Sequence, residues 1–526
     1  MEKSLFYSSD HGNLELLETA QPETNYFPAA KRGKNPWDKA HELQQKKSGN
    51  IYIEPNEILS GKKIISQKNE EVLESLESVA QNDYDPEWPY PQINGKADKK
   101  FWYLGDEFSQ LKSARDSVSD TTPVIRIAHF DTGYDPEHKS LLKNSIDTKN
   151  QKNFVEENNS SIDIGSEGLI NNPGHGTGTL SILAGNTMKI DEYQHNDFIG
   201  IHKNIKILPL RISRSVMLWK NKAFVDALEH VISLYDTPDR CDIVTMSMGG
   251  MPSKAWADVI NRAYEKGIFI VTAAGNNIGR ATPSTLVYPA RFERVTAACG
   301  VTYDYSPYYK PFGIRNIKTM EGNYGPKKCM TKAIAAFTPN VAWAIINSGN
   351  LVSINGAGTS SATPQIASAA ALYYQKYHTE LNAMPGWKKI ETIRQAMFDS
   401  AAKKIKDGFD NDITLYFGNG ILQANDMLEI KPSQVTVKKA DPAKVSWPFL
   451  KLVTGTELLE SSIEMYEVEI LQLISKSASL QKLLEYEEKN FDELTDKEQR
   501  QFYAIILEIP ETSEALKQLI LDNKLY

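Results

Sequence analysis

"SINGAGTSSATPQIASAAAL", residues 353–372, sets small and hydroxyl-bearing residues directly before a long alanine-rich segment. Gly358 and Thr359 precede Ser360, and Pro364 follows. Such a run suits a flexible linker, and a serine at the start of a helix is often only an N-cap. The same position gives a nucleophilic serine free backbone N–H groups and a helix dipole that favours an oxyanion. We place Pro364 in the first helical turn, where no amide partner is lost.

The composition of the whole chain is that of a soluble protein with one large domain. Its 526 residues are too many for one average domain and fit a large α/β domain with flanking modules. Hydrophobic residues make up 41% of the chain, enough to fill a sizeable core. The net charge of −8 leaves no basic surplus to neutralise phosphates, so we expect no nucleic-acid partner.

The cysteines and the first residues indicate the compartment. Cys241, Cys299 and Cys329 are odd in number and widely spaced, which fits neither a disulfide framework nor a metal knuckle. Residues 1–18 lack the basic start and apolar stretch of a secretory signal. The chain has no apolar run of about 18 residues that could span a membrane. We therefore expect a cytoplasmic protein with no membrane contact.

Composition divides the chain into three regions. Residues 1–115 are polar and contain a helix-like stretch at 35–49 and a strand-like one at 50–55. Residues 116–430 alternate strand-like and helix-like segments, and residues 431–526 read as a linker followed by an acidic helical module.

The acidic module has an apolar seam. Residues 456–526 hold 16 acidic and 7 basic side chains. The seam steps by four and three residues through Leu459, Ile463, Tyr466, Ile470 and Leu473. We expect it to pack on the main domain; a helix of a partner protein is the alternative.

The middle region predicts an α/β fold. Short apolar runs alternate with amphipathic stretches at 222–235 and 255–267, which favours a parallel sheet covered by helices on both faces. The predicted strands are 124–130, 205–212, 241–247, 267–273 and 294–300.

Polar residues follow several of these strands and open the predicted helices. Asp131 follows the first run, His175 lies between two glycines before an apolar helix, and Asn276 follows the run at 267–273. Each has an ordinary alternative as a turn or loop residue. In a parallel sheet, however, ligands bind beyond the carboxyl ends of the strands. With Ser360 these residues supply the carboxylate, base, oxyanion donor and nucleophile that acyl transfer needs.

The motifs around these residues resemble a known family. Asp-Thr-Gly at 131–133, Gly-His-Gly-Thr at 174–177 and Gly-Thr-Ser-Ser-Ala-Thr-Pro at 358–364 are similar to the three signatures of subtilisin-like serine proteases, the subtilases of peptidase family S8. Segments that resemble the substrate wall and oxyanion region of this family are 245–250, 273–276 and 288–292. The resemblance implies a three-layer, doubly wound, mostly parallel α/β fold.

The resemblance also implies roles. Ser360 would attack the peptide carbonyl, His175 would act as base and then acid, and Asp131 would orient the imidazole. Asn276 and the Ser360 N–H would bind the oxyanion. No metal and no organic cofactor would take part. Substrate-binding positions would be Ser247, Gly249, Ala274, Gly275 and Val287.

Two positions depart from the family pattern. Ser140 stands nine residues after Asp131, where many subtilases have a calcium-binding Asp, so we expect no calcium site there. Val287 stands where many relatives have Gly, which predicts a shallower specificity pocket for small or medium apolar side chains. Asn277 brings no negative charge, so a preference for basic side chains is not expected.

Residues 35–56 resemble the closing helix and strand of a subtilase propeptide. We expect this N-terminal region either to be cleaved after about residue 57 or to stay attached. A protease of the cytoplasm needs a gate, and the N-terminal region and the acidic helices are the candidates. A regulatory protein that binds the C-terminal helices is a further expectation.

Two other functions compete with this hypothesis. Asp-Thr-Gly also occurs in aspartic proteases, but that chemistry needs two carboxylates, and the chain has no second copy of the motif. The remaining alternative is a catalytically silent scaffold of subtilase fold that binds peptides or partners.

Overall fold

The computed structural model describes residues 3–7, 16–17, 24–25, 35–46, 51–56, 84–165, 171–201, 204–218, 220–278, 284–310, 319–409, 411–446, 460–485 and 488–526. The expected cleavage position after about residue 57 and Leu459 of the apolar seam lie outside these residues.

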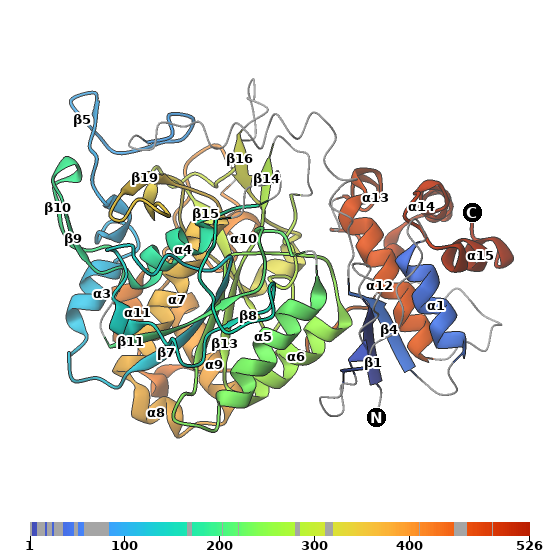
Figure 1. Cartoon of the computed structure of the whole chain (residues 1–526). Coiled ribbons are helices and arrows are strands. Elements are labelled where there is room, and N and C mark those ends of the chain that lie inside the picture. The colour runs from blue at the N-terminus through green and yellow to red at the C-terminus, as the bar shows by residue number, and fades with distance from the viewer. Residues whose placement is uncertain are drawn as a thin grey trace.

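A seven-stranded sheet forms the centre of the molecule (Figure 1). Its order is β17-β15-β13-β12-β7-β11-β8, and every described pairing within it is parallel. The α/β fold expected from the alternating pattern is therefore confirmed. The strands are β7 (Ile125–Asp131), β8 (Lys152–Asn153), β11 (Ile205–Arg211), β12 (Ile243–Met246), β13 (Phe269–Ala273), β15 (Thr296–Val301) and β17 (Ala333–Phe337).

Strand β7 illustrates why both faces of the sheet are covered. Ile125 and Ile127 belong to the hydrophobic cluster on the α4 and α7 face, whereas Ala128 and Phe130 belong to the cluster on the α5 and α6 face. Successive side chains of a strand point to opposite faces. The first face is covered by α3 (Leu111–Ser117), α4 (His175–Ala184), α7 (Thr359–Lys376), α9 (Gly386–Ser400) and α11 (Ala424–Glu429), and the second by α5 (Asn221–Leu234) and α6 (Lys254–Lys266).

Shorter elements surround these layers. Small two-stranded sheets are formed by β9 (Thr187–Ile190) with β10 (His195–Phe198), β14 (Asn276–Ile278) with β16 (Met320–Gly322), β18 (Val341–Ala344) with β19 (Val352–Gly356), β5 (Gln92–Ile93) with β6 (Lys96–Ala97), and β2 (Leu16–Leu17) with β3 (Thr24–Asn25). The remaining α-helices of the central unit are α8 (His378–Asn382) and α10 (Ile413–Phe417).

Residues 84–118 share the packing of the α/β unit. Tyr103 and Leu111 are buried in the same hydrophobic cluster as α4 and α7. The division of the chain at residues 115 and 430 stays a prediction.

The two ends of the chain pack together beside α5 and α6 (Figure 1). On the N-terminal side are β1 (Lys3–Tyr7), α1 (Pro36–Lys46) and β4 (Ile51–Pro55), with β1 and β4 paired in parallel. On the C-terminal side are α12 (Glu460–Lys476), α13 (Ala478–Leu483), α14 (Asp496–Glu508) and α15 (Glu514–Asp522).

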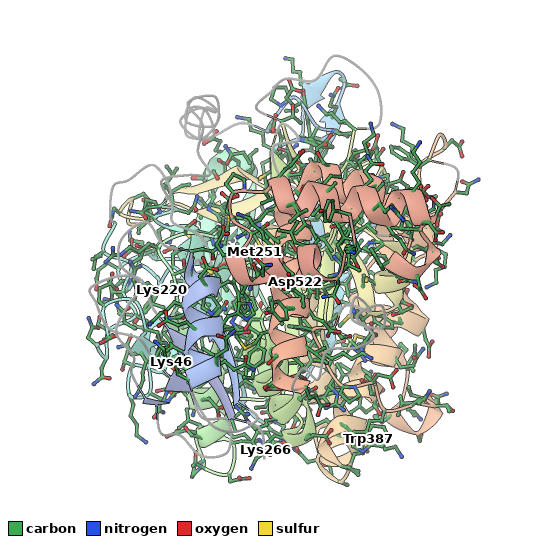
Figure 2. The ribbon with its side chains drawn as sticks, turned by 90° about the vertical axis from the view of Figure 1, so that its right-hand side faces the viewer. Lys46, Lys220, Met251, Lys266, Trp387 and Asp522 are labelled. Atoms are coloured by element: carbon green, nitrogen blue, oxygen red, sulfur yellow. The ribbon has the colours of Figure 1, made fainter. Side chains whose placement is uncertain are left out.

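Helices α1 and α12 meet through buried polar side chains as well as apolar ones; Figure 2 faces this side of the molecule. Trp37 Nε1 donates to Gln472 Oε1 at 2.9 Å, and Gln472 Nε2 donates to the carbonyl of Pro252 at 2.9 Å. His41 Nε2 lies 3.2 Å from Glu469 Oε2. Gln472 therefore links the N-terminal helix, the C-terminal helix and the central unit.

The seam of α12 is turned inward, as its spacing indicated. Tyr466, Ile470 and Leu473 are buried in the cluster that also contains Trp37 and Ile260 of α6, whereas Ile463, the other described residue of the seam, is half-buried. The seam therefore packs on α1 and the central unit. None of the described helices is long and apolar enough to cross a membrane.

Candidate active site

Asp131 is the last residue of β7, fully buried at the carboxyl end of the sheet. Its Oδ1 atom lies 2.7 Å from His175 Nδ1 and accepts from the Thr132 N–H at 2.8 Å. Its Oδ2 atom accepts from Thr179 Oγ1 at 3.1 Å. Burial by itself would raise the pKa of Asp131, but His175 above all, with His129 and the Thr132 N–H, outweighs it, so the pKa lies below its usual value. The group is therefore a carboxylate at neutral pH.

His175 begins α4 directly beside that carboxylate. The start of α4 can approach the turn after Asp131 this closely because residue 176 is glycine. A Cβ on Gly176 would collide with the Gly133 carbonyl oxygen. The ring of Trp343 meets the imidazole edge-on, with centroids 5.5 Å apart. Among the described residues, His175 Nε2 is buried and has no hydrogen-bond partner. The imidazole is thus held through Nδ1, while Nε2 is left to accept a proton.

Ser360 is the second residue of α7 and is buried at its N-terminus. The expectation that Pro364 lies in the first turn is wrong, because the amide of residue 364 would normally bond to the Ser360 carbonyl one turn earlier. Ser247 Oγ replaces that amide and donates to the Ser360 carbonyl at 2.9 Å. Ser360 Oγ in turn donates to the Ser247 carbonyl at 3.2 Å. Two hydrogen bonds between Ser247 and Ser360 therefore link the residue after β12 to the first turn of α7.

Asn276 is oriented by the residue before the serine. Its Oδ1 atom accepts from the Thr359 N–H at 2.8 Å, which directs its Nδ2 amide away from Thr359. Gly358 makes this approach possible: its φ is +78°, and a Cβ there would come within 2.9 Å of Asn276 Nδ2. The donating end of the amide consequently lies beside the start of α7.

The structure places the four predicted residues at the carboxyl ends of the strands. It shows no hydrogen bond between Ser360 and His175 among the described contacts. The described hydrogen bonds link His175 to Asp131 and Ser360 to Ser247. A serine hydroxyl changes partner by rotation about χ1, and catalytic hydrogen bonds are often incomplete without substrate.

The predicted substrate wall is closed in this structure. The Gly249 N–H donates to the Val216 carbonyl at 3.2 Å, and the Gly249 carbonyl accepts from the Leu218 N–H at 2.8 Å. An extended peptide can pair with Gly249 only after these two bonds open. Ser247, the neighbouring wall residue, is engaged with Ser360 as described above.

Val287 fills the space between two predicted pocket walls. A methyl group added at Gly249 would come within 2.3 Å of Val287 Cγ2, and one added at Gly275 within 2.8 Å of Val287 Cγ1. The Ala274 carbonyl accepts from the Val287 N–H at 3.0 Å. The isopropyl group of Val287 therefore lies close to both Gly249 and Gly275.

Three residues of the site escaped the sequence analysis. Thr179 bonds to Asp131, His129 bonds to Thr179, and Asp163 accepts from Thr132 Oγ1 at 3.1 Å. Two of them had a signal in the sequence. His129 stands two positions before Asp131 on a strand, and Thr179 stands one helical turn after His175, so each shares the face of its neighbour.

The described residues hold no group of three His, Cys, Asp or Glu side chains placed to bind a metal ion. Ser140, the residue at the position of the family's calcium-binding Asp, lies 2.7 Å from His138 Nδ1. Cys241, Cys299 and Cys329 are free thiols.

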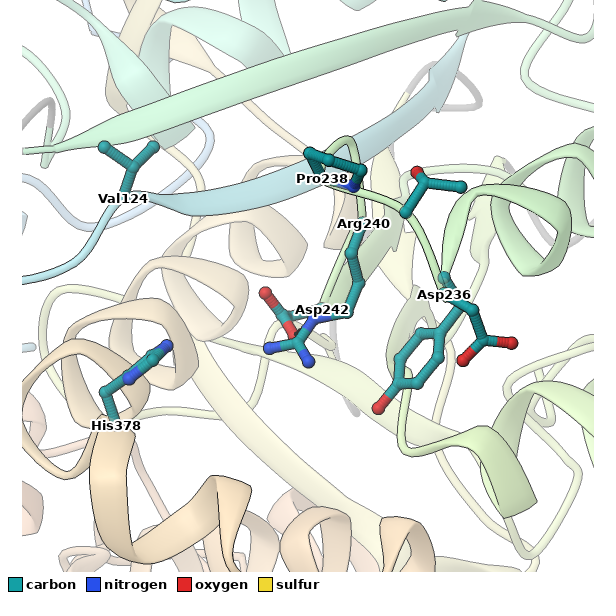
Figure 3. Close-up of a pocket in the computed structure, with 8 residues that line it drawn as sticks. Val124, Asp236, Pro238, Arg240, Asp242 and His378 are labelled. Atoms are coloured by element: carbon teal, nitrogen blue, oxygen red, sulfur yellow. Dashed lines mark ion pairs between the residues drawn. The ribbon is translucent and has the colours of Figure 1, made fainter.

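A polar hollow of about 520 Å³ lies at the amino ends of the strands, away from Asp131 at the carboxyl end of β7 (Figure 3). Its lining includes Val124 and Asp242, which precede β7 and β12, whereas Asp131 ends β7. Arg240 pairs with Asp242 at 3.0 Å and donates to Tyr374 at 2.9 Å. This hollow is therefore separate from the candidate active site.

Known proteins match the central unit. The model of the subtilase family matches residues 124–420. Subtilisin DY from Bacillus licheniformis is 26% identical over 253 residues, which cover 48% of this chain and 77% of that protein. Subtilisin E from Bacillus subtilis is 25% identical over 318 residues, 60% of this chain and 68% of that protein.

Among solved structures, that of the prenylagaramide maturation protease PagA covers 61% of this chain and 98% of its own, with 20% identity and a TM-score of 0.43. The family match spans more than half of the chain and includes the strand-end carboxylate, the histidine helix and the serine helix. The chain therefore belongs to the subtilase family and is a serine endopeptidase.

Proposed function

We propose that the chain hydrolyses peptide bonds through Ser360, His175 and Asp131, with Asn276 as oxyanion donor. The observation that carries the proposal is the 2.7 Å contact between His175 Nδ1 and Asp131 Oδ1. It fixes the tautomer in which Nε2 is unprotonated, and Nε2 has no competing partner among the described residues.

The proposed reaction has two halves. Ser360 Oγ attacks the carbonyl carbon while its proton passes to His175 Nε2, and the oxyanion accepts hydrogen bonds from Asn276 Nδ2 and the Ser360 N–H. His175 then gives the proton to the leaving amine, and an acyl ester remains on Ser360. Water repeats the sequence and releases the acid. Asp131 stays ionised and stabilises the imidazolium.

A serine-reactive fluorophosphonate probe tests this proposal directly. We expect covalent labelling of the full chain, with the adduct mapped to Ser360 by peptide mass spectrometry. Digestion of a peptide library by the same preparation reports turnover. A folded chain that neither labels nor cleaves any peptide, before or after removal of its N-terminal segment, contradicts the proposal.

A catalytically silent scaffold is the alternative to this proposal; membership of the subtilase family argues against it, and two contacts would fit it. Ser360 Oγ donates to Ser247 instead of His175, and Gly249 is already paired with residues 216–218. A scaffold would bind peptides with unchanged affinity after Ser360→Ala and would release no product, so product formation by the wild type excludes it.

We propose a preference for small or medium apolar side chains at the cleaved residue. The support is Val287, whose methyl groups lie between Gly249 and Gly275. Asn277 nearby is buried and uncharged, which offers nothing to a lysine or arginine side chain.

Shortening Val287 is expected to widen this preference. With Val287→Gly, kcat/KM for a phenylalanine substrate relative to an alanine substrate should rise about 10- to 100-fold, the range that a few methyl groups give in an apolar pocket. Val287→Ile is the matched variant and should change the ratio in the opposite direction. Equal ratios in all three proteins would show that Val287 does not line the pocket.

We propose that the N-terminal segment gates the site. Asn56 accepts from the Asn221 N–H at 2.9 Å and the Lys222 N–H at 2.8 Å, so it caps α5. The segment before α5, residues 216–218, is the one that closes on Gly249. Release of Asn56 would free the start of α5 and allow this segment to part from Gly249. The C-terminal helices support the gate because they hold α1.

Glu54 makes the attachment of this segment dependent on pH. Its buried carboxylate accepts from Tyr52 at 2.5 Å, from the Lys254 N–H at 3.0 Å, and from Ser253. Burial raises the pKa of Glu54 and the three donors oppose this, so the pKa is about 7, above the ordinary value of 4.5. A raised pKa stabilises the packed state fully below pH 4.5. That stabilisation, about 3 kcal/mol, is lost as the pH rises through 7.

We therefore expect weaker attachment at pH 8 than at pH 5. Hydrogen exchange of the amides of residues 51–56, corrected for intrinsic rates, should show lower protection at pH 8. Glu54→Gln removes the titration and should flatten the profile. Protection that is constant or greater at pH 8 in the wild type would contradict the prediction.

The compartment and the partner are also proposals. We propose that the protein works in the cytoplasm, where the free thiols of Cys241 and Cys299 stay reduced; cell fractionation tests this. We further propose that a regulatory protein binds the outward, acidic faces of the C-terminal helices, because the apolar seam of α12 is buried. Such a partner would carry a basic surface, and its binding would weaken with salt.

A further inference from the structure

A second histidine lies behind the proposed catalytic carboxylate. His129 is on β7, two residues before Asp131 and on the same face, and its side chain is buried. His129 Nε2 lies 2.9 Å from Thr179 Oγ1. It is 3.7 Å from Asp131 Oδ2, too far for a hydrogen bond. Any influence of His129 on the site through hydrogen bonds therefore passes through Thr179.

The Thr179 hydroxyl has one proton and three neighbours that compete for it. Asp131 Oδ2 lies at 3.1 Å, the Gly176 carbonyl at 3.3 Å and His129 Nε2 at 2.9 Å. If Nε2 were bare, it would attract the hydroxyl proton, and Asp131 Oδ2 would lose its donor. If Nε2 carries a proton, it donates to Thr179 Oγ1, and the hydroxyl proton is left for the carboxylate.

The charge of His129 matters as well. Burial lowers its pKa, against the attraction of Asp131, so the ring is neutral at physiological pH. A cation at this position would share Asp131 with His175 and weaken the support that the carboxylate gives to the imidazolium. Among the described residues, the charged and titratable groups that act on the pKa of His129 are Asp131, which raises it, and His175, which lowers it.

We propose that His129 is a positioning residue that, as the neutral Nε2–H form, turns the Thr179 hydroxyl toward Asp131 and so fixes the carboxylate that orients His175. The proposal rests on the proposed triad and adds two residues to it. Hydrogen bonds run in one direction, from His129 to Thr179 to Asp131 Oδ2, while Oδ1 serves His175.

A double-mutant cycle on the full chain tests the proposal. The variants are His129→Val, Thr179→Val and both together, with kcat expressed per active site after titration with the fluorophosphonate probe. Thr179→Val should lower kcat about tenfold, because one hydrogen bond to a charged group is lost. His129→Val should lower it about threefold to tenfold, and the double variant should match Thr179→Val within about twofold.

The pH profile separates positioning from a merely structural role. With one donor fewer, Asp131 stabilises the His175 cation more strongly, so the acid limb of kcat/KM should move to higher pH in Thr179→Val. His129→Gln places an N–H donor at similar reach and should restore most of the wild-type kcat. His138→Leu is the matched control, since that histidine is equally buried but bonds to Ser140 and not to the site.

The outcomes are distinct. Additive losses in the double variant would overturn the role of His129. An unmoved acid limb in Thr179→Val, with full titration of active sites, would overturn the donation from Thr179 to Asp131 on which that role depends. A wild type that neither labels nor hydrolyses peptides would instead overturn the proposed function. If His129→Val does not fold, the Thr179→Val and His129→Gln results still decide the question.

Discussion

Replacing Ser360 with alanine is expected to abolish both peptide hydrolysis and fluorophosphonate labelling. The residue lies at the N-terminus of α7, where the backbone amides of the first turn have no helical partner and Asn276 lies alongside. Alanine retains that environment but removes the atom that bonds to the substrate. We expect kcat to fall by at least about 10,000-fold. Peptide cleavage followed by chromatography measures the loss.

The neighbouring hydroxyl provides the control. Ser361 is also buried, but its Oγ bonds to Thr338 at 2.8 Å and to the Gly358 carbonyl at 2.9 Å. Ser361→Ala should keep labelling and turnover, apart from a modest loss of stability. Retention of more than about one hundredth of the wild-type kcat by Ser360→Ala would show that another group is the nucleophile.

Asp131→Asn is expected to have the next largest effect. The amide keeps the volume of the carboxylate in a fully buried site, so the fold should survive. An amide N–H beside His175 Nδ1 would favour the tautomer with the proton on Nε2, where the serine proton has to go. We expect kcat to fall about 10,000-fold at neutral pH, with KM little changed.

A second buried carboxylate is the matched control for this change. Asp242 lies at the amino end of β12, opposite the end at which Asp131 lies, and pairs with Arg240 at 3.0 Å. Asp242→Asn should reduce thermal stability but leave kcat per active site near the wild-type value. A loss of less than about tenfold in Asp131→Asn would mean that the carboxylate does not orient His175.

The sequence predicted those helices and strands whose apolar residues follow a local pattern. The runs at 124–130 and 205–212 became β7 and β11, because alternating and continuous apolar residues report which faces are buried. The amphipathic stretch at 222–235 became α5. Short motifs also located Asp131 and His175 at the ends of such elements, where turn geometry demands glycine.

The remaining features depend on contacts between distant parts of the chain. Trp37 and Gln472 are 435 positions apart, and no periodicity links them. The pairing of Gly249 with residues 216–218 follows from how two loops meet, and the replacement of the missing Pro364 amide by Ser247 depends on a neighbouring strand. A pattern within a short stretch of sequence therefore could not predict any of these three contacts.

The packing of α1 against α12 also bears on biosynthesis. The helix that contains Trp37 and His41 leaves the ribosome hundreds of residues before Glu469 and Gln472 exist. Until then its indole lacks the Gln472 acceptor and its imidazole lacks the Glu469 carboxylate. A nascent chain interrupted before residue 460 would contain residues 124–420, which match the subtilase family, without the helices that pack on α1. If the N-terminal segment gates the site as proposed, such truncated products should be the unregulated ones.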